Sequence, residues 1–95
     1  MISLTWAPIG IKKKTEHVMK SIHEPAYRGL VAELRRARER KGLTQAEVGR
    51  LVGHGRNWIS KVETCEIRLD VLQLVRICRI CGLKAHELVR GLEEA

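Results

Sequence analysis

Three polar residues in one short segment, Arg56, Asn57 and Lys61, carry side chains that can recognise the edges of nucleic-acid bases. A guanidinium group can donate to O6 and N7 of guanine, and a carboxamide can pair with N6 and N7 of adenine. Lys61 follows about one helical turn later and can reach a guanine or a phosphate. Because these residue types also occur on ordinary solvated surfaces, their role depends on the element that carries them.

Two of the three cysteines form a CxxC motif, Cys78-Arg-Ile-Cys81, a spacing found in metal-binding and redox-active sites. A structural zinc site needs four ligands, and the remaining candidates, Cys65, His54 and His86, are scattered along the chain. A redox pair gains its low thiol pKa at the start of a helix. This pair falls at the end of a predicted helix, where the dipole disfavours a thiolate. We therefore expect buried, reduced thiols and no metal site.

The chain contains no recognisable catalytic set. No nucleophile, base and orienting acid occur in a known order, and Gly53 and Gly55 lack the flanking motif of a phosphate-binding loop. The histidines show no partner pattern. We expect no enzyme activity, no cofactor and no small-molecule substrate.

The candidate base-contacting residues lie in a stretch, Thr44 to Glu63, whose pattern predicts two short helices joined by a tight turn. Thr44 and Glu47 form a capping box at the start of the first helix. Gly53 ends it, because glycine enters the left-handed conformation without a Cβ penalty. The second helix begins near Gly55 and runs to about residue 63. The apolar positions of the pair are Val48, Leu51, Val52, Trp58, Ile59 and Val62.

Two helices of this length cannot bury a core alone, so flanking helices must complete it. The first is expected to begin at Pro25, with Glu24 or Ser21 as its cap, and to end at Gly42. Its expected buried stripe is Tyr27, Leu30, Val31, Leu34 and Ala37.

Two further helices are expected after the motif. The first should run from the N-cap Asp70 to Cys81, with Gly82 as its stop. Its apolar residues form more than one stripe, which indicates burial in the core and in a possible dimer contact. They are Val71, Leu74, Val75, Cys78 and Cys81 along one side, with Leu72, Ile77 and Ile80 beside them. The second should span about Ala85 to Leu92 and fray at Gly91 and the acidic end.

Composition places the chain among small basic domains. Ninety-five residues make one domain with a modest core, and the absence of phenylalanine makes that core aliphatic. A net charge of +7 favours a polyanionic partner, usually nucleic acid. An odd cysteine count, no secretory signal and no run of transmembrane length indicate a reducing cytoplasm.

An ordered set of residues resembles the phage repressor and Cro-like (XRE-type) helix-turn-helix family. The set comprises Leu34, Arg35, Arg38, Gly42-Leu43-Thr44-Gln45, Gly53, Ile59-Ser60-Lys61-Val62-Glu63, Leu74 and Gly82. It keeps the family's register without a gap from about Tyr27 to Leu88. The resemblance implies an all-α, five-helix, lambda-repressor-like domain that binds double-stranded DNA.

The resemblance also implies roles for particular residues. The second helix of the motif, the recognition helix, would lie in the major groove, which makes Arg56, Asn57 and Lys61 the expected base contacts. Arg38 and Glu63 would form a structural ion pair. Contacts with the DNA backbone are expected from Gln45, Trp58, Ser60, Arg50 and Arg68. For two of these an alternative stays open: Trp58 can instead pack against the core, and Ser60 can simply face solvent.

Three positions depart from the family pattern. Gly49 replaces the usual alanine and would let the two helices of the motif cross at close range, and Gly55 replaces a common serine or threonine cap. Cys65 stands where glycine often follows the recognition helix, so a positive φ there would strain it.

Residues 1–23 are expected to form an extension of the domain that spans residues 24–95. Three interpretations stay open: a loosely packed segment, an arm whose Lys12-Lys13-Lys14 run touches phosphates, and a strand used in dimerisation.

We expect a sequence-specific regulator in the bacterial or phage cytoplasm, at the nucleoid, that acts as a dimeric repressor on a palindromic operator. The main alternative is an antitoxin-type protein that binds a partner toxin and represses its own operon. A restriction–modification controller protein and a non-specific architectural protein are further alternatives.

Overall fold

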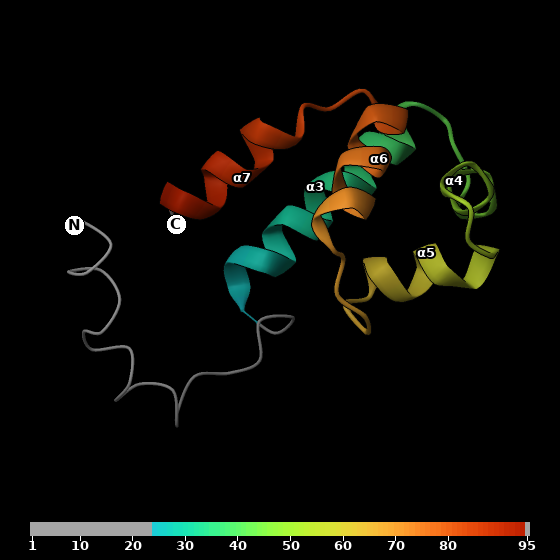
Figure 1. The fold of residues 1–95 in the computed structure, drawn as a ribbon, viewed down its shortest axis with the longest axis horizontal. Helices are drawn as coiled ribbons and strands as arrows, with labels where there is room; N and C mark the ends of the chain where they lie inside the picture. The colour runs from blue at the N-terminus through green and yellow to red at the C-terminus, as the bar shows by residue number, and fades with distance from the viewer. Residues whose placement is uncertain (1–23, 95) are drawn as a thin grey trace.

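The computed structural model describes residues 24–94 of the chain, which fold into five helices and, within that range, no strand (Figure 1). The sequence-based expectation of an all-α, five-helix fold is confirmed. The expectations for residues 1–23 lie outside the described range. The helices are α3 (Pro25–Arg40), α4 (Gln45–Val52), α5 (Arg56–Glu63), α6 (Val71–Cys81) and α7 (Ala85–Glu94). None of these helices is long and apolar enough to span a bilayer.

Side-chain hydrogen bonds mark the starts of α4 and α6. Thr44 Oγ1 accepts from Glu47 N–H at 3.0 Å, and Glu47 returns a bond to the backbone of Thr44, as the capping box predicts. Asp70 caps α6 in the same reciprocal way with Gln73. Glu24 occupies the N-cap position of α3, but its side chain makes no capping bond.

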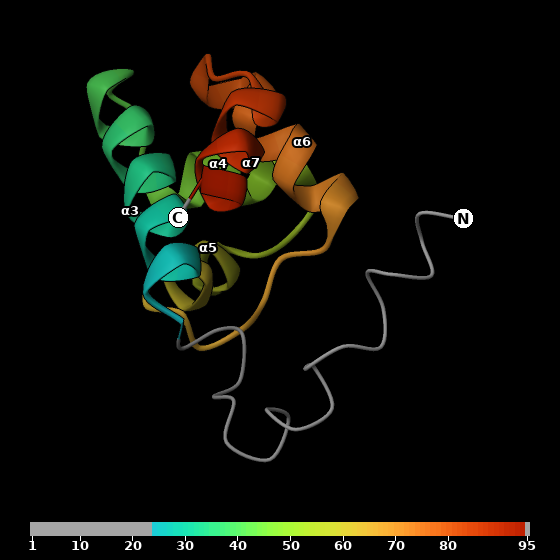
Figure 2. The same cartoon turned by 90° about the vertical axis from the view of Figure 1, so that its left-hand side faces the viewer.

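The helices form one core with the α4–α5 pair at one end and α7 at the other (Figures 1 and 2). Helices α3 and α6 contact each other, and each also contacts the α4–α5 pair and α7. The buried apolar residues are Leu30, Val31, Leu34, Ala37, Val48, Val52, Ile59, Val62, Cys65, Ile77, Cys78 and Cys81. The core is therefore aliphatic and thiol-rich, as the composition predicted.

Two apolar residues that fit the expected helix stripes are exposed in the structure. Leu51 is 58% exposed, because the packed side of α4 follows Val48, Gly49 and Val52. Val71 is 77% exposed, because α6 enters the core only further along.

The last helix extends beyond Leu92, the end expected from the sequence. Helix α7 continues to Glu94, and Leu88 and Leu92 pack against the core on either side of the glycine. Tertiary packing therefore outweighs the low helix propensity of glycine.

Gly49 is the point of closest approach between α4 and the following turn. A Cβ atom at this residue would lie 2.7 Å from the carbonyl oxygen of Gly55 and 3.3 Å from that of His54. The close approach predicted for Gly49 is present, but its partner is the backbone of the turn. A backbone carbonyl cannot move aside as a flexible side chain can, so a Cβ at this position would force the turn to shift.

Replacing Gly49 with alanine is expected to destabilise the domain by about 1 kcal/mol. Overpacking costs about 1–3 kcal/mol, which exceeds the gain of about 1 kcal/mol from better helix propensity. Gly29→Ala in α3 is the matched control, because a Cβ there meets nothing within 4 Å. That control should gain about 0.5–1 kcal/mol. Urea denaturation of both variants checks the opposite signs, and two stabilised variants would contradict the steric argument.

Candidate nucleic-acid interface

Helix α5 has one buried side and one exposed side. Ile59 and Val62 are each 2% exposed and attach the helix to the core. On the other side, Arg56, Asn57 and Lys61 are all exposed. Asn57 and Lys61 are four residues apart and therefore neighbours on the helix surface. The structure thus brings the three candidate base-contacting residues together on a surface open to a large partner.

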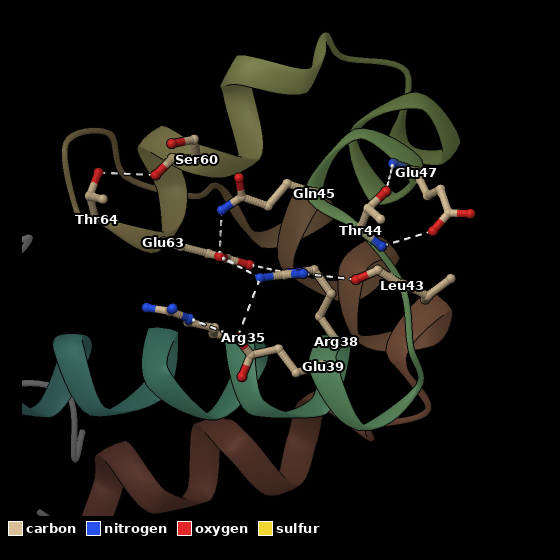
Figure 3. A network of polar contacts seen from close by, with 10 residues as sticks. All are labelled: Arg35, Arg38, Glu39, Leu43, Thr44, Gln45, Glu47, Ser60, Glu63 and Thr64. Atoms are coloured by element: carbon tan, nitrogen blue, oxygen red, sulfur yellow. Dashed lines mark hydrogen bonds and ion pairs between the residues drawn. The ribbon is translucent and has the colours of Figure 1, made fainter.

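An ion pair joins α3 to the last residue of α5 (Figure 3). Arg38 donates through Nε to Glu63 Oε2 at 2.6 Å and through Nη2 to Glu63 Oε1 at 3.0 Å. The two side chains are only 11% and 7% exposed. The pair that the family resemblance implied is therefore present, in the two-pronged geometry that a guanidinium and a carboxylate favour.

Two further hydrogen bonds complete this network (Figure 3). Arg38 Nη1 donates to the carbonyl oxygen of Leu43 at 2.8 Å, and Gln45 Nε2 donates to Glu63 Oε1 at 2.8 Å. The hydrogen bond with Glu63 raises the pKa of Arg38, which outweighs the lowering effect of burial. The guanidinium therefore stays charged, and it ties the end of the recognition helix to α3 and to the start of α4.

Trp58 lies at the border between the core and the surface. It is half-buried and packs against the core cluster. Its indole also stacks on the imidazole of His54, with ring centroids 4.0 Å apart and planes 14° apart. The core-supporting role considered for Trp58 is consistent with this placement, and part of the ring still faces the exterior.

The remaining predicted backbone contacts are spread around the motif. Arg50 on α4 and Arg68 in the loop after α5 are exposed, whereas Ser60 is half-buried. The carbonyl oxygen of Ser60 accepts from Thr64 Oγ1 at 3.0 Å. These three residues come from three different segments: α4, α5 and the loop after α5.

The loop that follows α5 has the positive φ at Cys65 that would strain a non-glycine residue. Cys65 has a φ of 60°, and it is the one non-glycine residue with positive φ among residues 24–94. A residue with a Cβ is disfavoured in this conformation. Its side chain is 6% exposed and belongs to the core, so packing offsets the strain.

The CxxC cysteines lie in the core rather than at a reactive surface. Cys78 and Cys81 are free thiols and 1% and 4% exposed. Burial raises the pKa of Cys78 to about 11 and also raises the pKa of Cys81. Within residues 24–94 no group of three or more histidine, cysteine or acidic side chains could hold a metal ion. Cys78 and Cys81 therefore fill space in the core as small apolar side chains.

Comparison with known proteins identifies the family. A helix-turn-helix domain model matches residues 30–90. The chain also resembles the solved structure of an XRE-family like protein from Pseudomonas syringae pv. tomato str. DC3000. The two are 35% identical, with a TM-score of 0.69, over 78% of this chain and 90% of that one. The chain belongs to the XRE-type helix-turn-helix family.

A similar fold is found in the crystal structure of the clp gene regulator ClgR from Corynebacterium glutamicum. It is 20% identical, with a TM-score of 0.65, over 75% of this chain and 76% of that one, so the likeness shows the shared fold alone. A search of curated proteins found no match. Membership of the XRE-type family supports a DNA-binding transcriptional regulator.

Some contacts at the site were not predicted from the sequence. Gln45 was assigned to a phosphate, but in this structure its amide binds Glu63. The stacking of His54 on Trp58 was also missed, because a spacing of four residues that begins in a turn gives no helical signal. The backbone N–H of Leu69 donates to the hydroxyl oxygen of Tyr27 at 3.1 Å, a link between distant segments that no local pattern indicates.

Proposed function

We propose that this protein is a transcriptional repressor that binds a palindromic operator as a homodimer. The observation that carries the proposal is that Arg56, Asn57 and Lys61 are exposed on α5, while Ile59 and Val62 of the same helix are buried. A helix held in this way can enter the major groove with its first residues against base edges. A bound dimer would block access of polymerase to a promoter.

In this proposal Arg56 recognises guanine and Asn57 recognises adenine, while Lys61 contacts a guanine or a phosphate. Gln45 can still donate to a phosphate, because the bond to Glu63 uses one of its two amide hydrogens. Contacts from Trp58, Ser60, Arg50 and Arg68 to the sugar-phosphate backbone would set the register without specifying sequence.

An exposed apolar surface on α6 and α7 supports the homodimer. Val71, Leu72 and Val89 are 77%, 57% and 40% exposed. Val71 and Val89 border a largely apolar groove. The groove is lined by Tyr27, Leu30, Arg68, Leu69, Asp70, Val71, Leu74, Val89 and Leu92. The groove is lined by none of the proposed base-contacting residues of α5, so a second copy bound there would leave Arg56, Asn57 and Lys61 uncovered.

Selection of the full chain against a random duplex pool tests the proposal. An enriched inverted repeat, with half-sites about 34 Å apart, supports a dimer that recognises sequence. Binding without enrichment would instead indicate an architectural protein held by phosphates alone. Enrichment of a single half-site would contradict the dimeric arrangement.

Val71→Asp is expected to shift the protein from dimer to monomer, because it places a charge on the apolar surface where a partner would bury it. Since Val71 is exposed, the fold should be unaffected. Leu51→Asp makes the same kind of change at an exposed apolar residue of α4, and it should leave the oligomeric state unchanged. Sedimentation equilibrium of both variants measures the outcome. A native chain that is monomeric at the concentrations used would contradict the proposed homodimer.

A further inference from the structure

His54, in the turn between α4 and α5, is held from two directions. Its backbone N–H donates to the carbonyl oxygen of Gly49 at 2.7 Å. Its imidazole stacks on Trp58, the third residue of α5, at a centroid distance of 4.0 Å. Although His54 is exposed, it therefore connects the end of α4 to the first turn of the recognition helix.

Gln73, in the first turn of α6, approaches the same imidazole. Its Oε1 accepts from the backbone of Asp70 at 3.0 Å, and its Nε2 lies 3.5 Å from His54 Nε2. An amide nitrogen can only donate, so this contact is a hydrogen bond when His54 carries its proton on Nδ1. The capping box of α6 thus orients the side chain that faces His54.

We propose that His54 is a positioning residue that sets the orientation of the first turn of α5, and with it Arg56 and Asn57, through its contacts with Trp58 and Gln73. The inference rests on the proposed DNA-binding role of α5. Arg56 and Asn57 directly precede Trp58 in the chain, so the orientation of the indole and that of this turn are coupled. Gly55 is the N-cap of α5 and makes no side-chain cap bond. The His54 imidazole, stacked on Trp58, therefore restrains the start of α5.

The contacts can be tested without DNA. A neutral imidazole in water carries its proton mainly on Nε2, so the Nδ1–H form expected for His54 is diagnostic. Nitrogen-15 chemical shifts of the His54 side chain distinguish the two tautomers. A dominant Nε2–H form would overturn the proposal, because Gln73 would then face another donor.

Tryptophan emission tests the stack. The chain has two tryptophans, so Trp6→Phe leaves Trp58 as the single emitter. His54→Ala should then change the emission of Trp58, and His54→Phe should restore most of the native signal because its ring can stack. An emission that is the same in all three proteins would overturn the stack.

DNA binding tests the consequence. His54→Ala should weaken affinity for the selected duplex by about two- to tenfold, the range expected from losing one aromatic pair. The slope of affinity against salt should not change, because no phosphate contact is lost. His54→Phe should recover most of the affinity.

His86→Ala, which removes an exposed imidazole from α7, is the matched control and should bind as the native chain does. A changed salt slope would overturn the positioning role in favour of direct contact with DNA. A native chain that enriches no sequence would overturn the proposed function instead, whereas the tautomer and emission measurements would still decide the contacts of His54.

Discussion

Arg38→Ala is expected to lower the free energy of unfolding by about 3–5 kcal/mol, the cost of removing one partner of a buried ion pair. The variant leaves Glu63, whose side chain is 7% exposed, as a carboxylate with Gln45 as its remaining side-chain donor. The carbonyl oxygen of Leu43 loses its side-chain donor as well. A small domain has only about 5–15 kcal/mol of stability, so the variant should be close to unfolding.

Arg38→Lys gives a milder version of the same experiment if the alanine variant does not fold. A lysine keeps the charge but lacks the planar fork that reaches both oxygens of Glu63 and the carbonyl of Leu43. Its stability should fall between that of the native chain and that of the alanine variant. Urea denaturation followed by circular dichroism measures all three proteins.

Arg35→Ala is the matched control. Arg35 lies on the same helix and pairs with Glu39 at 3.2 Å, but the two side chains are 59% and 51% exposed. Exposed pairs of this kind contribute about 0–1 kcal/mol. Equal losses from Arg35→Ala and Arg38→Ala would show that the Arg38–Glu63 pair adds nothing specific to the fold.

Arg56→Ala is expected to weaken binding to the selected operator by about 1–3 kcal/mol, or roughly five- to 150-fold. The loss should concentrate at one base pair, because the guanidinium would donate to O6 and N7 of a single guanine. Arg56 is exposed in the unbound domain, so stability should change little. Affinities for the operator and for its single-base variants, measured at fixed salt, test the effect.

Arg90→Ala on α7 removes the same charge from an exposed residue outside the α4–α5 motif and serves as the control. It should leave discrimination among operator variants intact. If Arg56→Ala weakens binding equally for every sequence and lowers the salt slope by about one, Arg56 contacts a phosphate and not a base. That result would remove the main support for sequence recognition by α5.

The sequence alone determined the helices and most of their ends. Capping boxes at Thr44 and Asp70 join residues three apart, and Gly53 and Gly82 adopt the left-handed conformation at the helix ends. These interactions are local, so spacing is enough to predict them. The strain at Cys65 was also predictable, because the family pattern prefers glycine there and the residue has positive φ.

The resemblance to the family predicted a long-range ion pair that local sequence patterns could not predict. Arg38 and Glu63 are 25 residues apart, and no periodicity connects them. Only their match to a known motif indicated the ion pair. The assignment of Gln45 to a phosphate came from the same source and omitted its bond to Glu63, because that bond depends on how α4 and α5 meet.

Tertiary structure decided the rest. Leu51 and Val71 fit helical stripes as well as their buried neighbours do, yet they are 58% and 77% exposed. An apolar stripe defines a side of a helix, but the neighbouring helices determine how much of that side they cover. The contacts of His54 likewise require α4, α5 and α6 to converge on one turn. Such convergence depends on three-dimensional packing, which the order of residues along one segment does not specify.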